Sequence, residues 1–209
     1  MRSENSQKSV PDYLIREFHE KSSDYCLVIP VINEGERLIY QLERINGLNL
    51  SIDVVVADGG SSDGSVDSEN LQSRGVKSCL VKTGPGKLSA QMRMAFDYAR
   101  THGYKGVISI DGNGKDGVES IEKIIEKLDE GFDFIQASRF IRGGVAVNTP
   151  ISRLIAIKFI HSPITSLGAG FRFTDSTNGF RGHSSLLIRD ERLGLFRDVF
   201  DTYELLAYM

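Results

Sequence analysis

Short apolar runs alternate with amphipathic segments along most of this 209-residue chain. Runs of this kind are typical of strands buried on both faces, and the segments between them have the spacing of helices packed on a sheet. Several of these segments stop at a glycine, the usual residue at the end of a helix. The alternation predicts an α/β fold with a mostly parallel sheet and helices on both faces.

The individual elements can be placed from this pattern. We expect strands at 26–31, 52–57, 76–81, 107–110 and 132–137, and helices at 34–46, 65–74, 88–102 and 118–130. After residue 138 the alternation breaks down into a glycine-containing loop, an apolar helix at 151–168, a strand at 179–183 and a helix at 200–209. Before the first strand, a short helix is expected around 13–21.

These elements predict one domain over residues 25–209, preceded by a polar N-terminal arm over residues 1–24. Because the chain stops inside a helical pattern without a cap, we expect the domain to be truncated at its C-terminus.

Composition excludes several classes of protein. The net charge of −3 gives no reason to expect nucleic acid as a partner. The two cysteines suggest neither a disulfide framework nor a zinc site. The polar start lacks an apolar signal core, and no apolar stretch reaches the roughly 18–20 residues that span a bilayer. We therefore expect a cytoplasmic protein, with peripheral contact at the membrane surface left open.

Charge is unevenly distributed along the chain. Residues 139–209 carry nine basic and six acidic side chains, and eight of the nine bases are arginines. Arginine matches phosphate oxygens with two parallel hydrogen bonds, so this part of the chain is the better place to look for anion contacts. Any single arginine could equally be a solvated surface residue.

Two of the expected strands end in acidic, glycine-rich loops. One loop begins at Asp58, and the other contains Asp111, Asn113 and Asp116. Carboxylate and amide oxygens suit a hard divalent cation and the diphosphate bound to it. Since ligands bind at the carboxyl ends of the strands in open α/β sheets, both loops are expected to border one crevice.

Familiar nucleotide and calcium motifs do not fit. Gly84 to Lys87 resembles part of a P-loop, but Val81 and Leu88 stand where a glycine and a Ser or Thr are needed. The loop after Asp111 has Lys115 at a position where an EF-hand needs a ligand. No G-x-G-x-x-G follows the first strand, which argues against a dinucleotide site.

Six motifs remain, and their order along the chain is more specific than any one of them. They are IPVINE at 29–34, DGGSSDG at 58–64, GKLSA at 86–90, DGN at 111–113, ASRFIRGG at 137–144 and DSTNGFR at 175–181. The series resembles the inverting family 2 glycosyltransferases with the GT-A fold, and among them the polyprenyl-phosphate (dolichyl-phosphate) mannosyl- and glucosyltransferases. The resemblance runs from about Cys26 to the end of the chain.

The resemblance implies a site for a nucleotide-sugar donor. The nucleotide would contact the residues that match the family's pocket: Pro30, Asn33, Glu34, Asp58, Lys87 and Asp111. Each has a structural alternative: a helix start for Asn33 and Glu34, a turn for Asp58, and an exposed helix end for Lys87. Family members commonly have a second acid where this chain has Gly59, so the choice between UDP- and GDP-sugars is not encoded.

The same resemblance implies a divalent cation, Mg²⁺ or Mn²⁺. Asp111 and Asn113 fill the family's D-x-D motif, and Asp116 could compensate for the charge that an amide at 113 removes. Asp111, Asn113 and Arg139 are the implied catalytic residues. Asp111 could instead be a loop acid that caps the following helix.

The acceptor is implied by arginines. Arg139 and Arg153 match those that face the diphosphate and the acceptor phosphate in the polyprenyl-phosphate enzymes, and Arg181 follows the DSTNGF element. A lipid phosphate is already anionic and needs positioning without a base, whereas a hydroxyl acceptor needs a general base. This favours a lipid phosphate, and with it a role in cell-envelope or glycolipid biosynthesis.

Other functions stay open at this point. The chain could transfer sugar to a saccharide hydroxyl, or bind nucleotide sugars with little catalysis. A sugar nucleotidyltransferase fits less well, because no glycine-rich, arginine-containing loop follows the first strand. The apolar segment 154–160 could lie at a membrane surface or cover the sheet edge. Nothing in the sequence encodes the oligomeric state.

Overall fold

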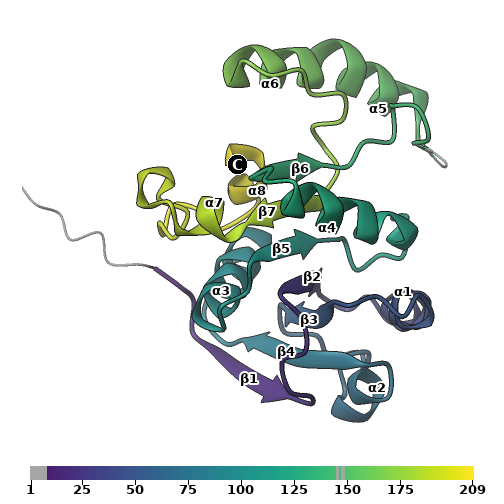
Figure 1. The fold of residues 1–209 in the computed structure, drawn as a ribbon, viewed down its shortest axis with the longest axis vertical. Coiled ribbons are helices and arrows are strands. Elements are labelled where there is room, and N and C mark those ends of the chain that lie inside the picture. Colours follow the sequence, from purple (N-terminus) through teal and green to yellow (C-terminus); the bar gives the residue numbers. More distant parts are fainter. Residues whose placement is uncertain (1–8, 145, 147–148) are drawn as a thin grey trace, which may run out of the picture.

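A seven-stranded mixed sheet forms the centre of the protein (Figure 1). The fold is described from a computed structural model, for residues 9–144, 146 and 149–209 with the side chain of Arg153 left aside. The strands are β1 (Tyr13–Glu17), β2 (Tyr25–Val31), β3 (Asp53–Asp58), β4 (Val76–Lys82), β5 (Gly106–Ser109), β6 (Phe134–Gln136) and β7 (Arg181–Ser184). Their order in the sheet is β1-β4-β3-β2-β5-β7-β6.

The middle of the sheet is parallel, as the sequence predicts. Strands β4, β3, β2 and β5 run in one direction, while β1 pairs antiparallel with β4 and β7 pairs antiparallel with β5 and β6. The carboxyl ends of the four parallel strands therefore meet at one edge, which positions the loops that follow them side by side.

Helices cover both faces of this sheet. The helices of the described residues are α1 (Glu36–Gly47), α2 (Ser68–Gln72), α3 (Leu88–Thr101), α4 (Ile121–Asp129), α5 (Ile151–Ala156), α6 (Ser162–Ala169), α7 (Ser185–Arg189) and α8 (Glu204–Tyr208), of which α5 and α6 stand apart from the sheet (Figure 1). Short 3₁₀ turns occupy Val118–Ser120 and Glu191–Leu193, and the π-helical segment Ile157–His161 joins α5 to α6.

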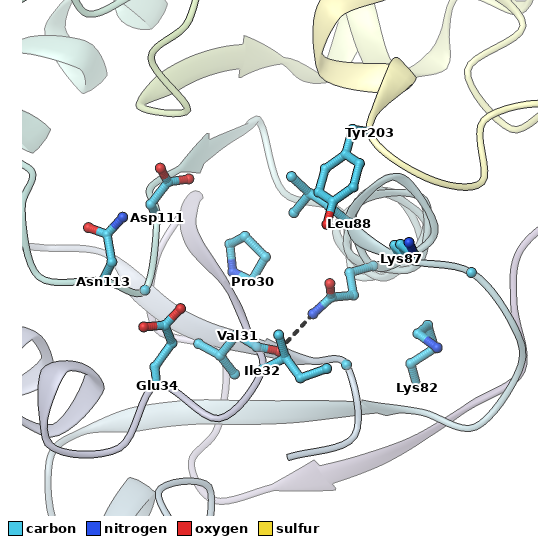
Figure 2. A pocket seen from close by; sticks show the side chains of 14 residues that line it. Pro30, Val31, Ile32, Glu34, Lys82, Lys87, Leu88, Asp111, Asn113 and Tyr203 are labelled. Atoms are coloured by element: carbon cyan, nitrogen blue, oxygen red, sulfur yellow. Dashed lines mark hydrogen bonds between the residues drawn. The ribbon is translucent and has the colours of Figure 1, made fainter. Parts of the chain in front are cut away.

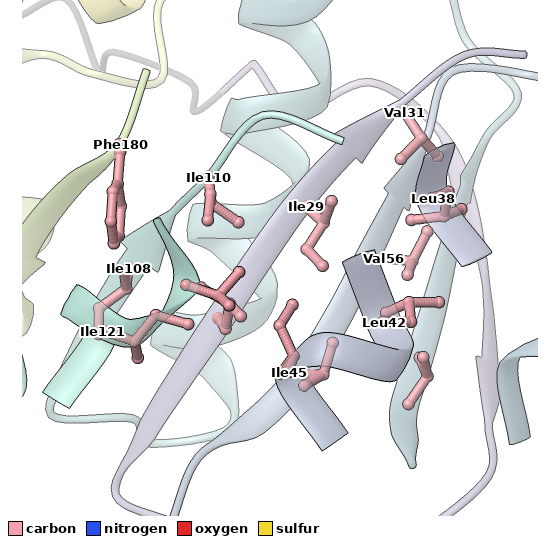
Figure 3. Packing of buried hydrophobic residues seen from close by; sticks show 14 of the residues in the cluster. Ile29, Val31, Leu38, Leu42, Ile45, Val56, Ile108, Ile110, Ile121 and Phe180 are labelled. Atoms are coloured by element: carbon pink, nitrogen blue, oxygen red, sulfur yellow. The ribbon is translucent and has the colours of Figure 1, made fainter. Parts of the chain in front are cut away.

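Alternation of side chains along the strands divides the core in two. Leu27 and Ile29 of β2 pack on one face, against the buried side of α1 and α4 (Figure 3). Cys26 and Val28 point to the other face, where they belong to the cluster that contains Phe96 of α3. Each central strand thus has apolar neighbours on both sides, which explains why these strands are unbroken apolar runs.

Two expectations about local structure are wrong. The segment expected to form a helix at 13–21 contains β1, because it finds an edge partner in β4, from Tyr13↔Lys82 to Glu17↔Ser78. Residues 185–189, for which no element was expected, form α7. The remaining expected elements exist, with ends that differ by a few residues. Residues 1–8 of the expected N-terminal arm lie outside the described part of the chain.

No helix in the described ranges is long and apolar enough to cross a bilayer.

A buried polar contact fixes the edge strand to the sheet. The Lys77 ammonium of β4, almost inaccessible to solvent, contacts the Glu17 carboxylate of β1 and donates a hydrogen bond to the Tyr98 hydroxyl oxygen at 2.9 Å. Tyr98 in turn donates to Glu17 at 2.8 Å. Burial lowers the pKa of Lys77, but hydrogen bonds to Glu17 and Tyr98 outweigh it and the net shift is upward.

Replacing Glu17 tests this contact. We expect Glu17→Ala to lower the free energy of unfolding by about 2–4 kcal/mol, because it leaves the Lys77 charge buried without its carboxylate. Leu14→Ala on the same strand is the matched control, since Leu14 is 63% exposed and its loss should cost less than about 0.5 kcal/mol. Urea unfolding of both variants measures the difference, and equal losses would show that the ion pair contributes nothing beyond strand packing.

Candidate functional site

A cavity of about 440 Å³ lies at the carboxyl ends of the parallel strands. Its lining comes from the loops after β2, β3, β4 and β5 and from the C-terminal segment: Pro30, Val31, Ile32, Glu34, Gly59, Lys82, Gly86, Lys87, Leu88, Gln91, Asp111, Gly112, Asn113 and Tyr203. Figure 2 shows Glu34, Asp111 and Asn113 on one side of the hollow. Lys82, Lys87 and Tyr203 lie on the other side, so the cavity has an oxygen-rich end and a basic, aromatic end.

Asp111 follows β5 and is packed against the backbone of a distant loop. A Cβ atom at Gly179 would lie 2.4 Å from Oδ1 of Asp111, so only glycine lets the carboxylate take this position. Gly179 belongs to the DSTNGFR motif, nearly seventy residues away in the sequence. The two motifs that sequence analysis singled out separately therefore meet at one carboxylate.

Asp116 lies next to Asp111 in the same loop. Its Oδ2 accepts from the backbone N–H of Asp111 at 3.4 Å. Burial, with the Asp111 charge as the second cause, raises the pKa of Asp116 to about 6. Two neighbouring carboxyl groups repel each other when both are ionised, so a positive charge beside them is stabilised.

The rest of this loop is held by the protein. Asn113 lines the cavity, and its Oδ1 accepts from Lys115 N–H at 3.0 Å in a local turn. Gly114 N–H donates to Oε1 of the buried Gln41 on α1, also at 3.0 Å. The local turn and the bond to α1 therefore fix the position of the D-x-D-like motif, Asp111 to Asn113.

The oxygen donors at this end of the cavity suit a hard cation only together with further ligands from substrate phosphates and water. In the described residues, no three His, Cys, Asp or Glu side chains are grouped closely enough to hold a metal by themselves. Mg²⁺ is commonly bound by one or two carboxylates together with substrate phosphates and water. The carboxylates of Asp111 and Asp116, with the raised pKa of Asp116, suit that mode of binding.

The loops after β2 and β3 are joined to each other. Asn33, at a left-handed φ of 52°, donates its N–H to Ser61 Oγ at 2.9 Å and accepts from Ser62 N–H at 2.8 Å. Glu34 lines the cavity and pairs with Arg37 at 3.0 Å. Asn33 is therefore a link between loops, while Pro30 and Glu34 border the cavity itself.

Asp58 is buried and lies beneath this surface. Its Oδ1 accepts from the N–H and the hydroxyl of Ser61, at 2.9 and 2.7 Å. It thereby shapes the turn after β3, and the cavity lining in that place comes from Gly59. The role of Asp58 in nucleotide binding stays a prediction.

The N-terminus of α3 meets the C-terminal segment at the basic end. Lys87 donates its backbone N–H to the carbonyl of Asp201 at 2.7 Å, and Ser89 donates to that of Thr202 at 2.8 Å. These bonds place the Tyr203 ring 5.9 Å from the Lys87 ammonium. The sequence analysis identified Lys87 but missed Tyr203, Lys82 and Gln91; Gln91 directly follows the GKLSA motif, which was the signal that could have found it.

Arg139 makes the strongest ion pair near the site. It forms two parallel bonds with the fully buried carboxylate of Asp175, at 2.7 and 3.0 Å, and a third with Thr177 Oγ1 at 3.0 Å. Burial by itself would raise the pKa of Asp175, but the hydrogen bonds from Arg139 outweigh it and lower the pKa. The pair orders the DSTNGFR loop and leaves about a quarter of the Arg139 side chain exposed.

The other arginines are placed differently. Arg181 is buried on β7 and donates to the carbonyls of Ser176, Asn178 and Leu206. Burial lowers the pKa of Arg181 to about 10. Its expected contact with an acceptor phosphate stays a prediction, and the side chain of Arg153 lies outside the described residues.

Comparison with known proteins identifies the family. The sequence profile described as glycosyl transferase family 2 matches residues 26–193. The chain belongs to glycosyl transferase family 2. This confirms the family that the order of the six motifs predicted.

Relatives within the family include lipid-phosphate enzymes. The polyprenol monophosphomannose synthase of Mycolicibacterium smegmatis is 27% identical over 160 residues, which cover 75% of this chain and 60% of that protein. The undecaprenyl-phosphate mannosyltransferase of Micrococcus luteus is 28% identical over 164 residues, covering 78% and 67%. The chain therefore spans about two thirds or less of the length of these relatives.

Solved structures support the fold. Glucosyl-3-phosphoglycerate synthase of Mycobacterium tuberculosis, in complex with Mn²⁺, UDP and phosphoglyceric acid, matches with a TM-score of 0.55 and 16% identity over 78% of this chain and 56% of that one. The same enzyme with Mg²⁺ and UDP gives a TM-score of 0.51. The expected GT-A fold is confirmed.

Removing Arg139 should destabilise the family 2 domain. We expect Arg139→Ala to lower the free energy of unfolding by about 3–5 kcal/mol at pH 7, because it leaves the Asp175 carboxylate buried and unpaired. Arg142→Ala is the matched control, an exposed arginine three residues away whose loss should cost less than about 0.5 kcal/mol. Urea unfolding at pH 7 compares the two, and similar midpoints would contradict the structural role of the pair.

The same pair predicts a pH dependence. With its pKa lowered, Asp175 binds fewer protons in the folded than in the unfolded protein, so its stabilising contribution is present above about pH 4 and is lost as the pH falls through the lowered value. In Arg139→Ala, uncompensated burial should raise that pKa and reverse the trend. Unfolding midpoints between pH 3 and 7 measure both slopes, and parallel slopes would contradict the assignment.

Proposed function

We propose that this domain takes part in the inverting transfer of a sugar from a UDP- or GDP-sugar to a polyprenyl phosphate. One observation carries the proposal: Asp111 and Asn113 line the same cavity as Pro30, Glu34 and Lys87. These residues come from three separate motifs of a family 2 glycosyltransferase, and they surround a space large enough for much of a nucleoside diphosphate.

The donor would lie across the ends of the strands. Its diphosphate would lie at the oxygen-rich end of the cavity. There Asp111 and Asn113 would hold a divalent cation, and Asp116, bonded to the Asp111 backbone, would add negative charge. Such a cation neutralises the charge of the leaving diphosphate. The nucleoside would extend over Pro30 toward Lys87, the opposite end of the cavity. Adjacent strands are about 4.8 Å apart, so a cavity that crosses several of them has room for it.

The acceptor side is supported by positive charge without an obvious base. Arg139 keeps part of its guanidinium exposed while Asp175 fixes its orientation. A phosphate already carries its nucleophilic oxygen as an anion, so an oriented arginine is enough to position it. A second cavity, of about 550 Å³, contains Lys158 and Arg172 beside Phe140 and Phe159.

An apolar surface next to that cavity suits a lipid. Large apolar side chains are exposed along α5, α6 and the segments beside them: Ile151, Ile155, Phe159, Ile160, Ile164, Leu167 and Phe171. Figure 1 shows α5 and α6 apart from the helices that pack on the sheet. Contiguous exposed apolar surface of this kind is typical of interaction or membrane sites, so we place the domain at the cytoplasmic membrane surface.

This surface is tied to the loop that orients Arg139. Phe173 N–H donates to Ser166 Oγ of α6 at 2.9 Å, and Ser176 Oγ contacts His161 Nδ1 at 2.7 Å. Docking of the helices on a membrane would therefore bring Arg139 to a defined height above the lipid phosphates.

Donor binding is tested at Asp111. We expect Mn²⁺ to increase the thermal stabilisation of the wild-type protein by UDP-glucose or GDP-mannose, by roughly 2.7 kcal/mol when the ligand is at about 100 times its dissociation constant. Asp111→Ala should abolish the increase caused by Mn²⁺. Asp67→Ala is the control, since Asp67 is exposed on the loop after β3 and outside the cavity. Cation-dependent binding that survives in Asp111→Ala would overturn the assigned cation site.

Transfer is tested with radiolabelled donors and competing acceptors. We expect the protein to give product with undecaprenyl phosphate and none with saccharide acceptors. Product formed with a saccharide and not with undecaprenyl phosphate would show that the acceptor is a sugar hydroxyl rather than a lipid phosphate. If the protein bound the donor but transferred no sugar, its function would be nucleotide-sugar binding without catalysis.

The apolar surface gives a separate prediction. Leu167→Ser should weaken sedimentation with phosphatidylglycerol vesicles about three- to tenfold, because Leu167 is 87% exposed and would insert into the interface. Leu186→Ser is the matched control, a leucine 74% exposed on α7 and outside this surface. Equal vesicle binding by both variants would show that α5 and α6 do not contact lipid.

A further inference from the structure

One side chain in the donor cavity has a polar atom that the fold leaves unused. Gln91 of α3 is 5% exposed and lines the cavity. Its Nε2 donates to the carbonyl of Val31 at 2.9 Å and to that of Ala57 at 2.8 Å. Within the described part of the chain, its Oε1 accepts no hydrogen bond.

The two bonds fix which way the amide points. An amide nitrogen has two hydrogens to donate, and here both go to carbonyl oxygens. Rotating the amide by half a turn would put Oε1 against those two oxygens, which repel it. Gln91 therefore presents a fixed hydrogen-bond acceptor to the cavity, with no freedom to become a donor.

Gly59 makes room for the Gln91 amide. A Cβ atom at position 59 would lie 3.0 Å from Gln91 Nε2 and 3.3 Å from the carbonyl oxygen of Val31. A side chain there would crowd the amide, whereas glycine leaves a flat surface beside it. The cavity lining at the junction of β2 and β3 thus includes Gly59 and one oriented amide, beside Pro30, Val31 and Ile32.

The position of Gln91 assigns it to the nucleoside half of the donor. It bridges the ends of β2 and β3, whereas Asp111 follows β5 on the other side of β2. At about 4.8 Å per strand, that is more than a strand spacing from the oxygen-rich end. Tyr203, on the basic side of the same cavity, adds an exposed aromatic face (Figure 2).

We propose that Gln91 and Tyr203 form the nucleobase subsite, in which Gln91 Oε1 accepts a hydrogen bond from a ring N–H of the base and the Tyr203 ring packs against the base. The inference rests on the proposed donor site. A flat ring fits beside Gly59, and an acceptor that lines the cavity without a hydrogen-bond partner in the described residues favours a ligand that supplies N–H. Uracil and guanine both carry such a ring N–H, at N3 and N1.

Changing the ligand tests the hydrogen bond without disturbing the protein. Calorimetric titration of the wild-type domain with UDP and GDP in Mn²⁺ identifies the tighter nucleotide. That nucleotide is then compared with its analogue methylated at the ring N–H and with its 2′-deoxy and 3′-deoxy analogues. We expect methylation to weaken binding about tenfold or more, because it removes the donor and leaves Oε1 unpaired. The deoxy analogues should lose much less.

Variants connect the effect to the two residues. Gln91→Leu should bind the parent nucleotide more weakly than the wild-type protein does. The variant should bind the methylated analogue and the parent nucleotide about equally well. Gln136→Leu is the matched control, a half-buried glutamine on β6 whose Nε2 likewise donates to two carbonyls, those of Ala137 and Asn178, outside the cavity, and it should keep the methylation penalty. Tyr203→Ala should weaken both nucleotides about tenfold, as expected for lost stacking.

Each outcome decides the inference. Equal binding of methylated and parent nucleotides by the wild-type protein would overturn it while leaving the donor site intact. So would a Gln91-dependent loss seen only with a deoxyribose analogue, which would assign the amide to the ribose. If Gln91→Leu does not fold, the wild-type ligand series still decides. Failure of both UDP and GDP to bind would overturn the proposed function and this subsite with it.

Discussion

Parallel pairing of β4, β3, β2 and β5 is the constraint on which the site depends. These strands are buried on both faces, and their shared direction places every loop that follows them at one edge. Pro30, Gly59, Lys82 and Asp111 are far apart in the sequence and meet there. The hydrophobic packing that stabilises the sheet therefore also assembles the cavity.

Carboxylates and arginines near this edge are held in pairs that have different consequences. Asp175 is matched by two bonds from Arg139, so its charge is stabilised and the DSTNGFR loop is ordered. Asp116 is buried with Asp111 as its neighbour, and burial first and the Asp111 charge second raise its pKa. The Arg139–Asp175 pair balances its own charge, whereas the two carboxylates of Asp111 and Asp116 are where we propose that a cation binds. This difference follows from which partner each carboxylate has, rather than from its residue type.

Motif order predicted the family and the fold class because the pattern of buried strands and glycine-rich loops is local in the sequence. It could not predict what each side chain faces. Asp58 and Asn33 belong to the expected motifs, yet here they bond Ser61 and Ser62 of the neighbouring turn. Arg181 donates to three backbone carbonyls. Gln91 and Tyr203 lie outside the six motifs and line the cavity because α3 and the C-terminal segment pack together.

The sequence by itself determined the alternation of strands and helices, the acidic loops at strand ends and the arginine-rich later part, since each depends on neighbouring residues. Tertiary structure decided the rest. It made residues 13–17 an edge strand, because their partner β4 is some sixty residues away. It brought Gly179 against Asp111 and set the Gln91 amide between β2 and β3. Such contacts join distant segments, and only packing of the whole chain fixes their geometry.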